Sequence, residues 1–214
     1  MATATPRRAP AAPDQGRRAA AGDGDTAARI LDVAEALIQV RGFNAFSYAD
    51  IAAELDVTKA SLHYHFASKA ELGQALIDRY AYRFAQLLGG IGDATDGAAA
   101  RLRAYASLYA DVLRGRRMCL CGMLAAEHET LPAQIGEAVV AFFDMNEAWL
   151  TRVLERGRAD GSLRFSGSAR ENARMLIDGL EGAMLVARPY GDLRRFQATA
   201  RRLLAGFAPS PQAV

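Results

Sequence analysis

The residues best equipped for chemistry in this chain lie close together in one short segment. Lys59 and Lys69 are its only lysines, His63 and His65 are two of its three histidines, and every other cationic side chain is an arginine. Ammonium and imidazole N–H groups donate hydrogen bonds to phosphates and base edges. The segment therefore predicts contact with DNA.

The same segment has the pattern of a helix with one buried face. Leu62 and Phe66 are four positions apart, so they share a side of the helix and leave the donors to the other side. Thr58 is suited to cap the start of this helix. The helix must end near Phe66, because Ser68 and Glu71 form a capping box that begins the next one.

Two further helices precede this one and must position it. We expect the first to begin at the capping residue Asp25 and to end at Gly42. Ser47 and Asp50 form a capping box for a short second helix, and a tight turn follows at Asp56. Two short helices joined by such a turn predict a helix-turn-helix. The chain holds one such motif, which reads half of a palindromic operator, so we expect a homodimer.

Several residues of this region match a known pattern, namely Gly42-Phe43, Ile51-Ala52, Val57, Leu62, His65-Phe66, Lys69 and Leu72. On these residues, the stretch 26–73 resembles the DNA-binding domain of the TetR/AcrR family of bacterial transcriptional regulators. The resemblance implies three helices for DNA, a fourth linking helix, and a C-terminal helical domain. That domain would bind a small-molecule effector and dimerise through its last two helices.

The resemblance also implies which residues meet double-stranded operator DNA. Ser47, Tyr48, Tyr64 and Lys69 would bind the backbone, and the residues near bases or phosphates would be Thr58, Lys59, Ala60, Ser61, His63 and His65. Two positions depart from the pattern. His63 stands where a tyrosine is common, and Asp56 stands where the turn often has glycine; aspartate tolerates the left-handed conformation better than most residues.

The net charge is too small to predict DNA binding by itself. It is +2 for the whole chain, and residues 26–70 carry four basic against five acidic side chains. Any DNA affinity must then come from individually placed donors rather than from a diffuse positive field. This balance keeps open an alternative, a helical adaptor that does not bind DNA.

The chain predicts an all-α fold of about nine helices. Alanine, leucine, arginine, glutamate and aspartate dominate its 214 residues, and 51% of them are hydrophobic, which is enough to bury a core. Beyond a long fourth helix that stops at Gly89-Gly90, we expect helices at 98–114, 120–128, 133–158, 168–187 and 192–206. Neither a membrane span nor a secretory signal is expected, which predicts a cytoplasmic protein.

Four regions are expected along the chain. Residues 1–24, rich in Ala, Pro, Gly and Arg, predict a disordered arm whose arginines either are solvated or touch DNA. Residues 25–70 form the helix-turn-helix domain, residues 71–207 the effector-binding and dimerisation domain, and residues 208–214 a tail.

Two sets of side chains are expected to serve the C-terminal domain. Aromatic, thioether and thiol groups would line a cavity for a small, largely apolar effector: Tyr105, Tyr109, Cys119, Met123, Phe142, Phe143, Met145, Trp149 and Met175. Mostly small or apolar residues of the last two helices would form the dimer interface: Gly179, Gly182, Ala183, Val186, Phe196 and Leu203.

Other chemistries are weighed on the cysteines and histidines. Cys119, beside two arginines at a helix N-terminus, would have a lowered pKa, which makes an oxidant or electrophile sensor an alternative. His63 and His65 are not expected to bind metal, because positions two apart do not face each other on a helix. Cys119, Cys121 and His128 stay an open alternative as metal ligands. No catalytic motif or cofactor loop is present, so we expect neither an enzyme nor a cofactor.

Overall fold

The computed structural model describes residues 15–208, which form nine α-helices, one 3₁₀ turn and no strand. The predicted all-α class is confirmed. The helices are α1 (Gln15–Arg41), α2 (Tyr48–Leu55), α3 (Lys59–His65), α4 (Lys69–Ala94), α5 (Ala98–Arg114), α6 (Leu120–Ala126), α7 (Ala133–Ala159), α8 (Ala169–Tyr190) and α9 (Leu193–Ala205), with η1 (His128–Thr130) between α6 and α7.

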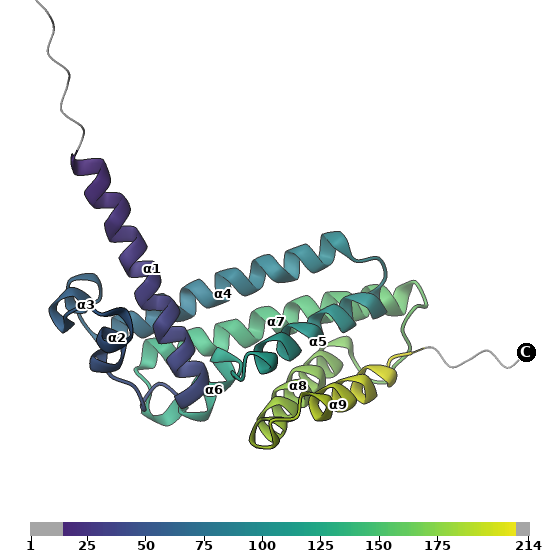
Figure 1. The fold of residues 1–214 in the computed structure, drawn as a ribbon. Helices are drawn as coiled ribbons and strands as arrows, with labels where there is room; N and C mark the ends of the chain where they lie inside the picture. The colour runs from purple at the N-terminus through teal and green to yellow at the C-terminus, as the bar shows by residue number, and fades with distance from the viewer. Residues whose placement is uncertain (1–14, 209–214) are drawn as a thin grey trace, which may run out of the picture.

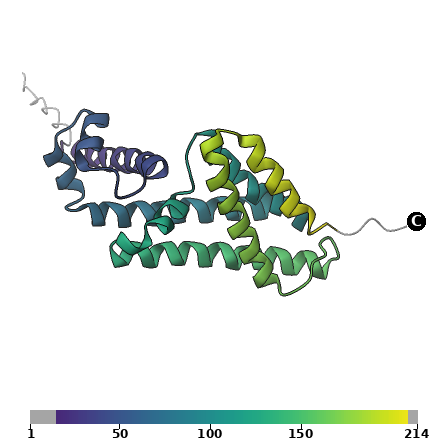
Figure 2. The same cartoon turned by 90° about the horizontal axis from the view of Figure 1, so that it is seen from below.

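The helices form a small N-terminal group and a larger C-terminal one. α1, α2 and α3 gather at one end of the molecule, and α4 runs from them along the C-terminal helices (Figure 1). Seen from below, α4 and α7 run side by side while α8 crosses near their far end and α9 packs on it (Figure 2). The long α4 and α7 therefore connect the two groups.

Two helix boundaries differ from the expectation by more than three residues. α1 begins at Gln15 rather than at Asp25, so residues 15–24 are helical and not part of a disordered arm; residues 1–14 lie outside the described part of the chain. α4 continues through Gly89 and Gly90 to Ala94. Both glycines have open space where a side chain would be, and helix propensity alone did not stop the helix there.

Local capping builds the turns of the N-terminal group largely as predicted. The backbone N–H of Ser47 donates to Asp50 Oδ2 at 2.7 Å, closing the capping box of α2. Asp56 ends α2 in the left-handed conformation, with φ of 52°. At the start of α4, Ser68 caps the N–H of Glu71, but the Glu71 carboxylate accepts from Ala67 N–H at 3.0 Å instead of from Ser68.

The core of the C-terminal group is strongly aromatic. Phe84 of α4 packs edge-on against Phe142 of α7 at 5.1 Å between ring centroids, and Tyr105 of α5 stacks on Trp149 at 5.7 Å. Inside this core, the Tyr105 hydroxyl donates to Asn146 Oδ1 at 3.0 Å. Side chains fill the space around Tyr105, Phe142 and Trp149, where the sequence predicted part of a ligand cavity.

Candidate nucleic-acid interface and ligand pocket

The exposed side of α3 carries the hydrogen-bond donors. Leu62 and Phe66 are buried, whereas Lys59, His63 and Tyr64 face solvent, with 75% of Tyr64 exposed. Short capped helices fix this orientation, because a buried apolar pair four positions apart determines which side of the helix turns outward. α3 therefore presents donors on a free helical face, as a recognition helix must.

The other predicted contacts beside α3 differ in exposure. Thr58 and Ala60 are exposed, and Ser61 and His65 are half-buried. The hydroxyl of Thr58 accepts the N–H of Ser61 at 3.2 Å, which confirms its role as the helix cap. The ring of His65 lies edge-on to that of Tyr64 at 5.2 Å.

His63 is fixed at the C-terminal end of α3. Its Nδ1 lies 3.2 Å from the carbonyl oxygen of Ala67, and its ring centroid lies 4.7 Å from that of Tyr48. A carbonyl only accepts, so this hydrogen bond requires the proton on Nδ1 and leaves Nε2 as the outer ring nitrogen. His63 is thus held in place while its outer edge stays available.

The prediction that Tyr48 contacts the DNA backbone is wrong. The side chain is buried, and its hydroxyl donates to the carbonyl oxygen of Phe66 at 2.9 Å. Burial, together with the nearby Glu71 carboxylate, raises the pKa of Tyr48 to about 12, so the phenol stays a neutral donor. A hydroxyl already committed inside the protein has no free direction toward a phosphate.

Lys69 is also held more tightly than the sequence implied. Its Nζ donates to the carbonyl oxygen of Phe46 at 2.5 Å and lies over the rings of Phe43 and Phe46, 4.7 and 4.3 Å from their centroids. Burial lowers the pKa of Lys69, while the charges of Glu127 and Asp50 act in the opposite direction. Lys69 as a residue remains half-exposed at the protein surface.

Several predicted contacts meet at one surface hollow of about 400 Å³ beside α3. Lys59, His63 and Lys69 line it together with Ser47 and the edge of Tyr48. Three of these side chains carry N–H groups, and they come from two helices, Lys59 and His63 from α3 and Lys69 from the start of α4. The fold thus assembles donors that the charge count alone could not reveal.

Three of the five acidic residues of the region have partners outside α3. Arg79 of α4 binds Asp32 at 2.9 Å and Glu35 at 3.0 Å, and both acids belong to α1. Asp50 is engaged with Ser47 and lies 3.4 Å from Arg41. These three acids fix the helices against each other, so much of the negative charge of residues 26–70 is engaged away from the surface of α3.

Comparison with known proteins agrees with this geometry. Residues 30–76 match the family described as bacterial regulatory proteins of the tetR family, and residues 98–203 match the tetracyclin repressor-like C-terminal domain. A TetR-family regulator from Agrobacterium tumefaciens is 35% identical, with a TM-score of 0.85 over 87% of this chain and 100% of that one. The chain belongs to the TetR family.

Two further relatives extend the match. A TetR regulator from Legionella pneumophila is 34% identical, with a TM-score of 0.77 over 84% of this chain and 95% of that one. Transcriptional regulator AcuR from Cereibacter sphaeroides is 29% identical over 192 residues, which are 87% of each chain. As a TetR-family member the protein is a DNA-binding transcriptional regulator and not an enzyme, so the adaptor alternative is set aside. Within residues 15–208, no helix is long and apolar enough to cross a membrane.

The side chains predicted to line an effector cavity do not share one in this TetR-family fold. Met123 and Phe143 line a pocket of about 450 Å³ between α6, α7 and α8, which we call the α6–α8 pocket. Tyr109 and Cys119 border a void of only about 10 Å³ between α4, α5 and α8. A void of that size holds a water molecule at most.

The remaining predicted effector residues lie inside the core or outside any pocket. Tyr105 and Phe142 are fully buried in the aromatic core, and Met145 and Trp149 pack against it. Met175 is 46% exposed on the outer side of α8, so its assignment to a cavity is wrong. Helical spacing identified apolar side chains but not which of them border empty space.

The two thiols also differ from the prediction. Cys119 and Cys121 are free and buried, and burial raises the pKa of both well above the usual range. The neighbouring Glu181 carboxylate raises it further. The predicted lowering by two nearby arginines is therefore wrong, because Arg116 and Arg117 are exposed while the sulfur atoms are enclosed. No cluster that could hold a metal ion occurs among residues that the structure describes.

Several predicted dimer residues serve packing within the chain. Phe196 is buried, and Gly179 admits the Leu203 side chain of α9, whose Cδ1 would lie 2.8 Å from a Cβ at position 179. Gly179 therefore allows α8 and α9 to approach each other. Ala183 is half-buried, whereas Gly182 and Val186 lie on the open side of α8.

One carboxylate, missed from the sequence, joins the two helix groups. Glu127, directly after α6, accepts the backbone N–H of Phe43 at 2.5 Å, and Asn44 donates its side-chain amide to Thr130 at 2.7 Å. The N–H of Met118 also donates to the carbonyl oxygen of Gln39 at 3.0 Å. The end of α1 is thereby attached to both sides of α6.

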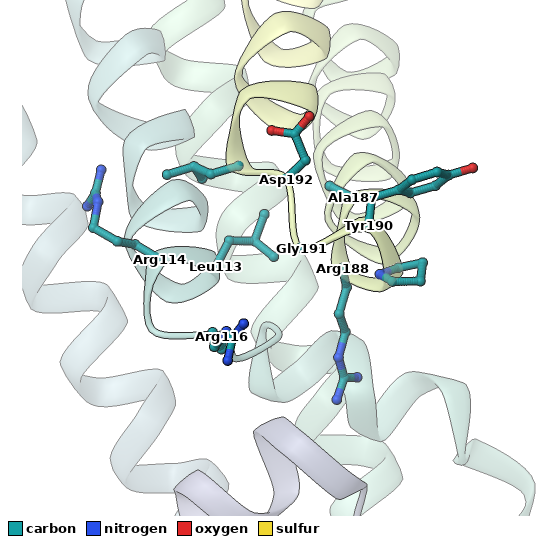
Figure 3. Close-up of a pocket in the computed structure, with 10 residues that line it drawn as sticks. Leu113, Arg114, Arg116, Ala187, Arg188, Tyr190, Gly191 and Asp192 are labelled. Carbon is teal, nitrogen blue, oxygen red and sulfur yellow. The ribbon is translucent and has the colours of Figure 1, made fainter.

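Arg188 adds a third attachment from α8. It lines a hollow of about 630 Å³ between the α5–α6 and α8–α9 turns, and its guanidinium extends toward α1 (Figure 3). The group donates to the carbonyl oxygen of Val40 and contacts Met123 Sδ at 3.4 Å. Arg188 thus touches both α1 and a side chain of the α6–α8 pocket.

Proposed function

We propose that the protein is a dimeric repressor that binds a palindromic operator and is released from it by a small, largely apolar effector. The observation that carries the DNA-binding part is the meeting of Lys59, His63 and Lys69 at the exposed side of α3. One helix-turn-helix per chain reads one half-site, and a dimer places two recognition helices about 34–36 Å apart. The proposed place of action is the cytoplasm, where operator DNA lies.

The α6–α8 pocket is the proposed effector site. Its volume of about 450 Å³ suits a small organic molecule, and its walls are largely apolar. α6 forms one wall, and the flanks of α6 hold the end of α1 through Met118 and Glu127. An effector that displaces α6 would move α1 and, with it, the recognition helix.

Release requires a preference between two states. An effector shifts the regulator off DNA only if it binds the DNA-incompetent arrangement of α1 and α6 more tightly than the competent one. An effector that binds both arrangements equally would leave operator affinity unchanged. The alternative of a thiol sensor is not favoured, since burial keeps Cys119 and Cys121 in the unreactive protonated form.

The DNA-binding proposal is tested by fluorescence anisotropy with duplexes from the region flanking the protein's own gene. We expect sequence-preferring binding that weakens steeply with salt. Lys59→Ala should weaken it about tenfold and lower the salt dependence by roughly one phosphate contact. Arg103→Ala, which removes an exposed cation on α5, is the matched control and should change nothing. Equal, weak affinity for all duplexes would refute the proposal.

A further inference from the structure

Glu181 of α8 has an unusual position at the α6–α8 pocket. Its Oε1 is the only carboxylate oxygen among residues 24–208 that is enclosed without a hydrogen-bond partner, and the side chain lines the pocket. Gly122 of α6 faces it, because a Cβ there would collide with Glu181 Oε2. The absence of a side chain at Gly122 makes room for the carboxyl group.

The surroundings leave this acid without a charge partner. No described cation lies within ion-pair distance of it, and Arg174, which lines the same pocket, donates to Glu147 at 2.8 Å instead. The Cys119 thiol donates a hydrogen bond to the carboxylate. An enclosed carboxylate oxygen with no donor of its own is costly, so a ligand that supplies one is favoured.

The rest of the pocket selects the sign and the shape of such a ligand. Besides Glu181, three acids but only one cation line it, so the local charge is negative. The remaining walls are mostly apolar, and the main residues that form them are Met118, Met123, Phe143, Ile177 and Leu185. The aromatic ring of Phe143 can face a cation.

We propose that the α6–α8 pocket binds an organic cation, in which a protonated amine donates to Glu181 and an apolar body lies against Met123 and Phe143. The proposal rests on the proposed function, in which this pocket is the effector site. It defines the polar end of an effector whose apolar part the walls already favour. Since Gly122 and Met123 belong to α6, the ligand would bear directly on the helix that holds α1.

The proposal is tested by isothermal titration of the full chain with three compounds of one shape. 4-Phenylbutylamine is cationic, 4-phenylbutan-1-ol is neutral and 4-phenylbutanoate is anionic at neutral pH. We expect one amine per chain, bound at least about tenfold more tightly than the alcohol, and no binding of the carboxylate. Glu181→Gln should weaken binding of the amine about tenfold and change binding of the alcohol little. The matched control is Glu155→Gln, which replaces an exposed acid on α7 and should change neither affinity.

A second arm uses the unaltered protein and varies pH. Burial raises the pKa of Glu181 to about 7, opposed by the hydrogen bond from Cys119, so its ionised fraction rises from about one tenth at pH 6 to about nine tenths at pH 8. The amine stays protonated over this range. Its affinity should therefore rise roughly tenfold from pH 6 to pH 8 and stay flat in Glu181→Gln.

The variant isolates Glu181 from the other ionisable groups around the pocket and beneath it. These are Cys119, Cys121, Tyr80, Tyr105, Tyr109, Asp144, Glu147, Arg174 and Asp178. Equal affinities for amine and alcohol, or an amine affinity that is independent of pH, would overturn the inference even if Glu181→Gln failed to fold. The DNA assay above is a separate test. Operator binding without amine binding would refute only this inference. Amine binding without operator binding would refute only the proposed repressor.

Discussion

At the scale of single residues, Tyr48 holds the helix-turn-helix together from within. Its hydroxyl joins the start of α2 to Phe66, directly after α3, and its ring lies against His63. One hydrogen bond and one ring contact therefore add to the buried apolar side chains that hold the two helices at their angle. The exposed donors of α3 owe their direction to a tyrosine that itself faces inward.

Tyr48→Phe separates this role from a DNA contact. Removing the hydroxyl leaves the Phe66 carbonyl oxygen buried without a donor, so the free energy of unfolding should fall by about 1–2 kcal/mol. Urea denaturation measures this loss. Tyr82→Phe, at a tyrosine that is 67% exposed, should be silent. If the folded Tyr48→Phe protein instead bound operator about tenfold more weakly with unchanged stability, the hydroxyl would be a phosphate ligand after all.

The residue scale is also where sequence interpretation succeeds only in part. The capping roles of Ser47, Thr58 and Asp56 could be predicted because they depend on neighbours within a few positions. The partners of Tyr48 and Lys69 lie 18 and 23 positions away, and nothing local specifies them. Polar residues can be recognised from sequence, whereas the distant carbonyl groups to which they donate hydrogen bonds are brought near only by tertiary packing.

At the scale of helices, the N-terminal part of α4 is packed between the two helix groups. A Cβ at Gly73 would lie 2.5 Å from Ile135 Cδ1 of α7 and 2.8 Å from the ring of Phe43, which follows α1. The backbone of α4 thus approaches both groups more closely than any other residue type allows. The length of the segment and the helical spacing of its apolar residues predicted α4, but neither of these features shows how closely its backbone approaches Ile135 and Phe43.

Gly73→Ala tests how tight this junction is. The added methyl group must displace Ile135 or Phe43, and we expect the free energy of unfolding to fall by about 1–3 kcal/mol. Gly89→Ala on the same helix, where a side chain meets nothing, should raise it by roughly 0.5–1 kcal/mol. Denaturant titration of both variants gives the comparison. Stabilisation by both substitutions would mean that α4 is free to shift at the junction.

At the scale of the whole molecule, α8 rather than α9 exposes apolar side chains. Met175, Leu185 and Val186 are 46%, 61% and 50% exposed, whereas α9 buries Phe196 and presents mainly arginines outward. The predicted interface is thus narrower than expected, because Phe196, Gly179 and Leu203 already pack within the chain. The face of α8 around Val186 is the part left for the second copy of the proposed dimer, since Gly182 also lines the α6–α8 pocket.

Val186→Asp should weaken the proposed dimer at least about tenfold, because it would place a charge in an apolar contact. Light scattering after size exclusion, over a dilution series, measures the change. Val140→Asp on α7, where the valine is 54% exposed, is the matched control and should leave the dimer intact. Unchanged assembly of Val186→Asp would move the interface away from this face of α8.

The attachment of Glu127 to Phe43 has a consequence for the order in which the protein is made. The two residues are 84 positions apart, Met118 binds Gln39 from just before α6, and Arg188 reaches Val40 across 148 positions. A ribosome releases α1, α2 and α3 long before these partners exist. Helices α1, α2 and α3 are made first, and they are attached to the C-terminal helices only after α6 and then α8 have emerged, so the contacts that join the two helix groups form late in synthesis.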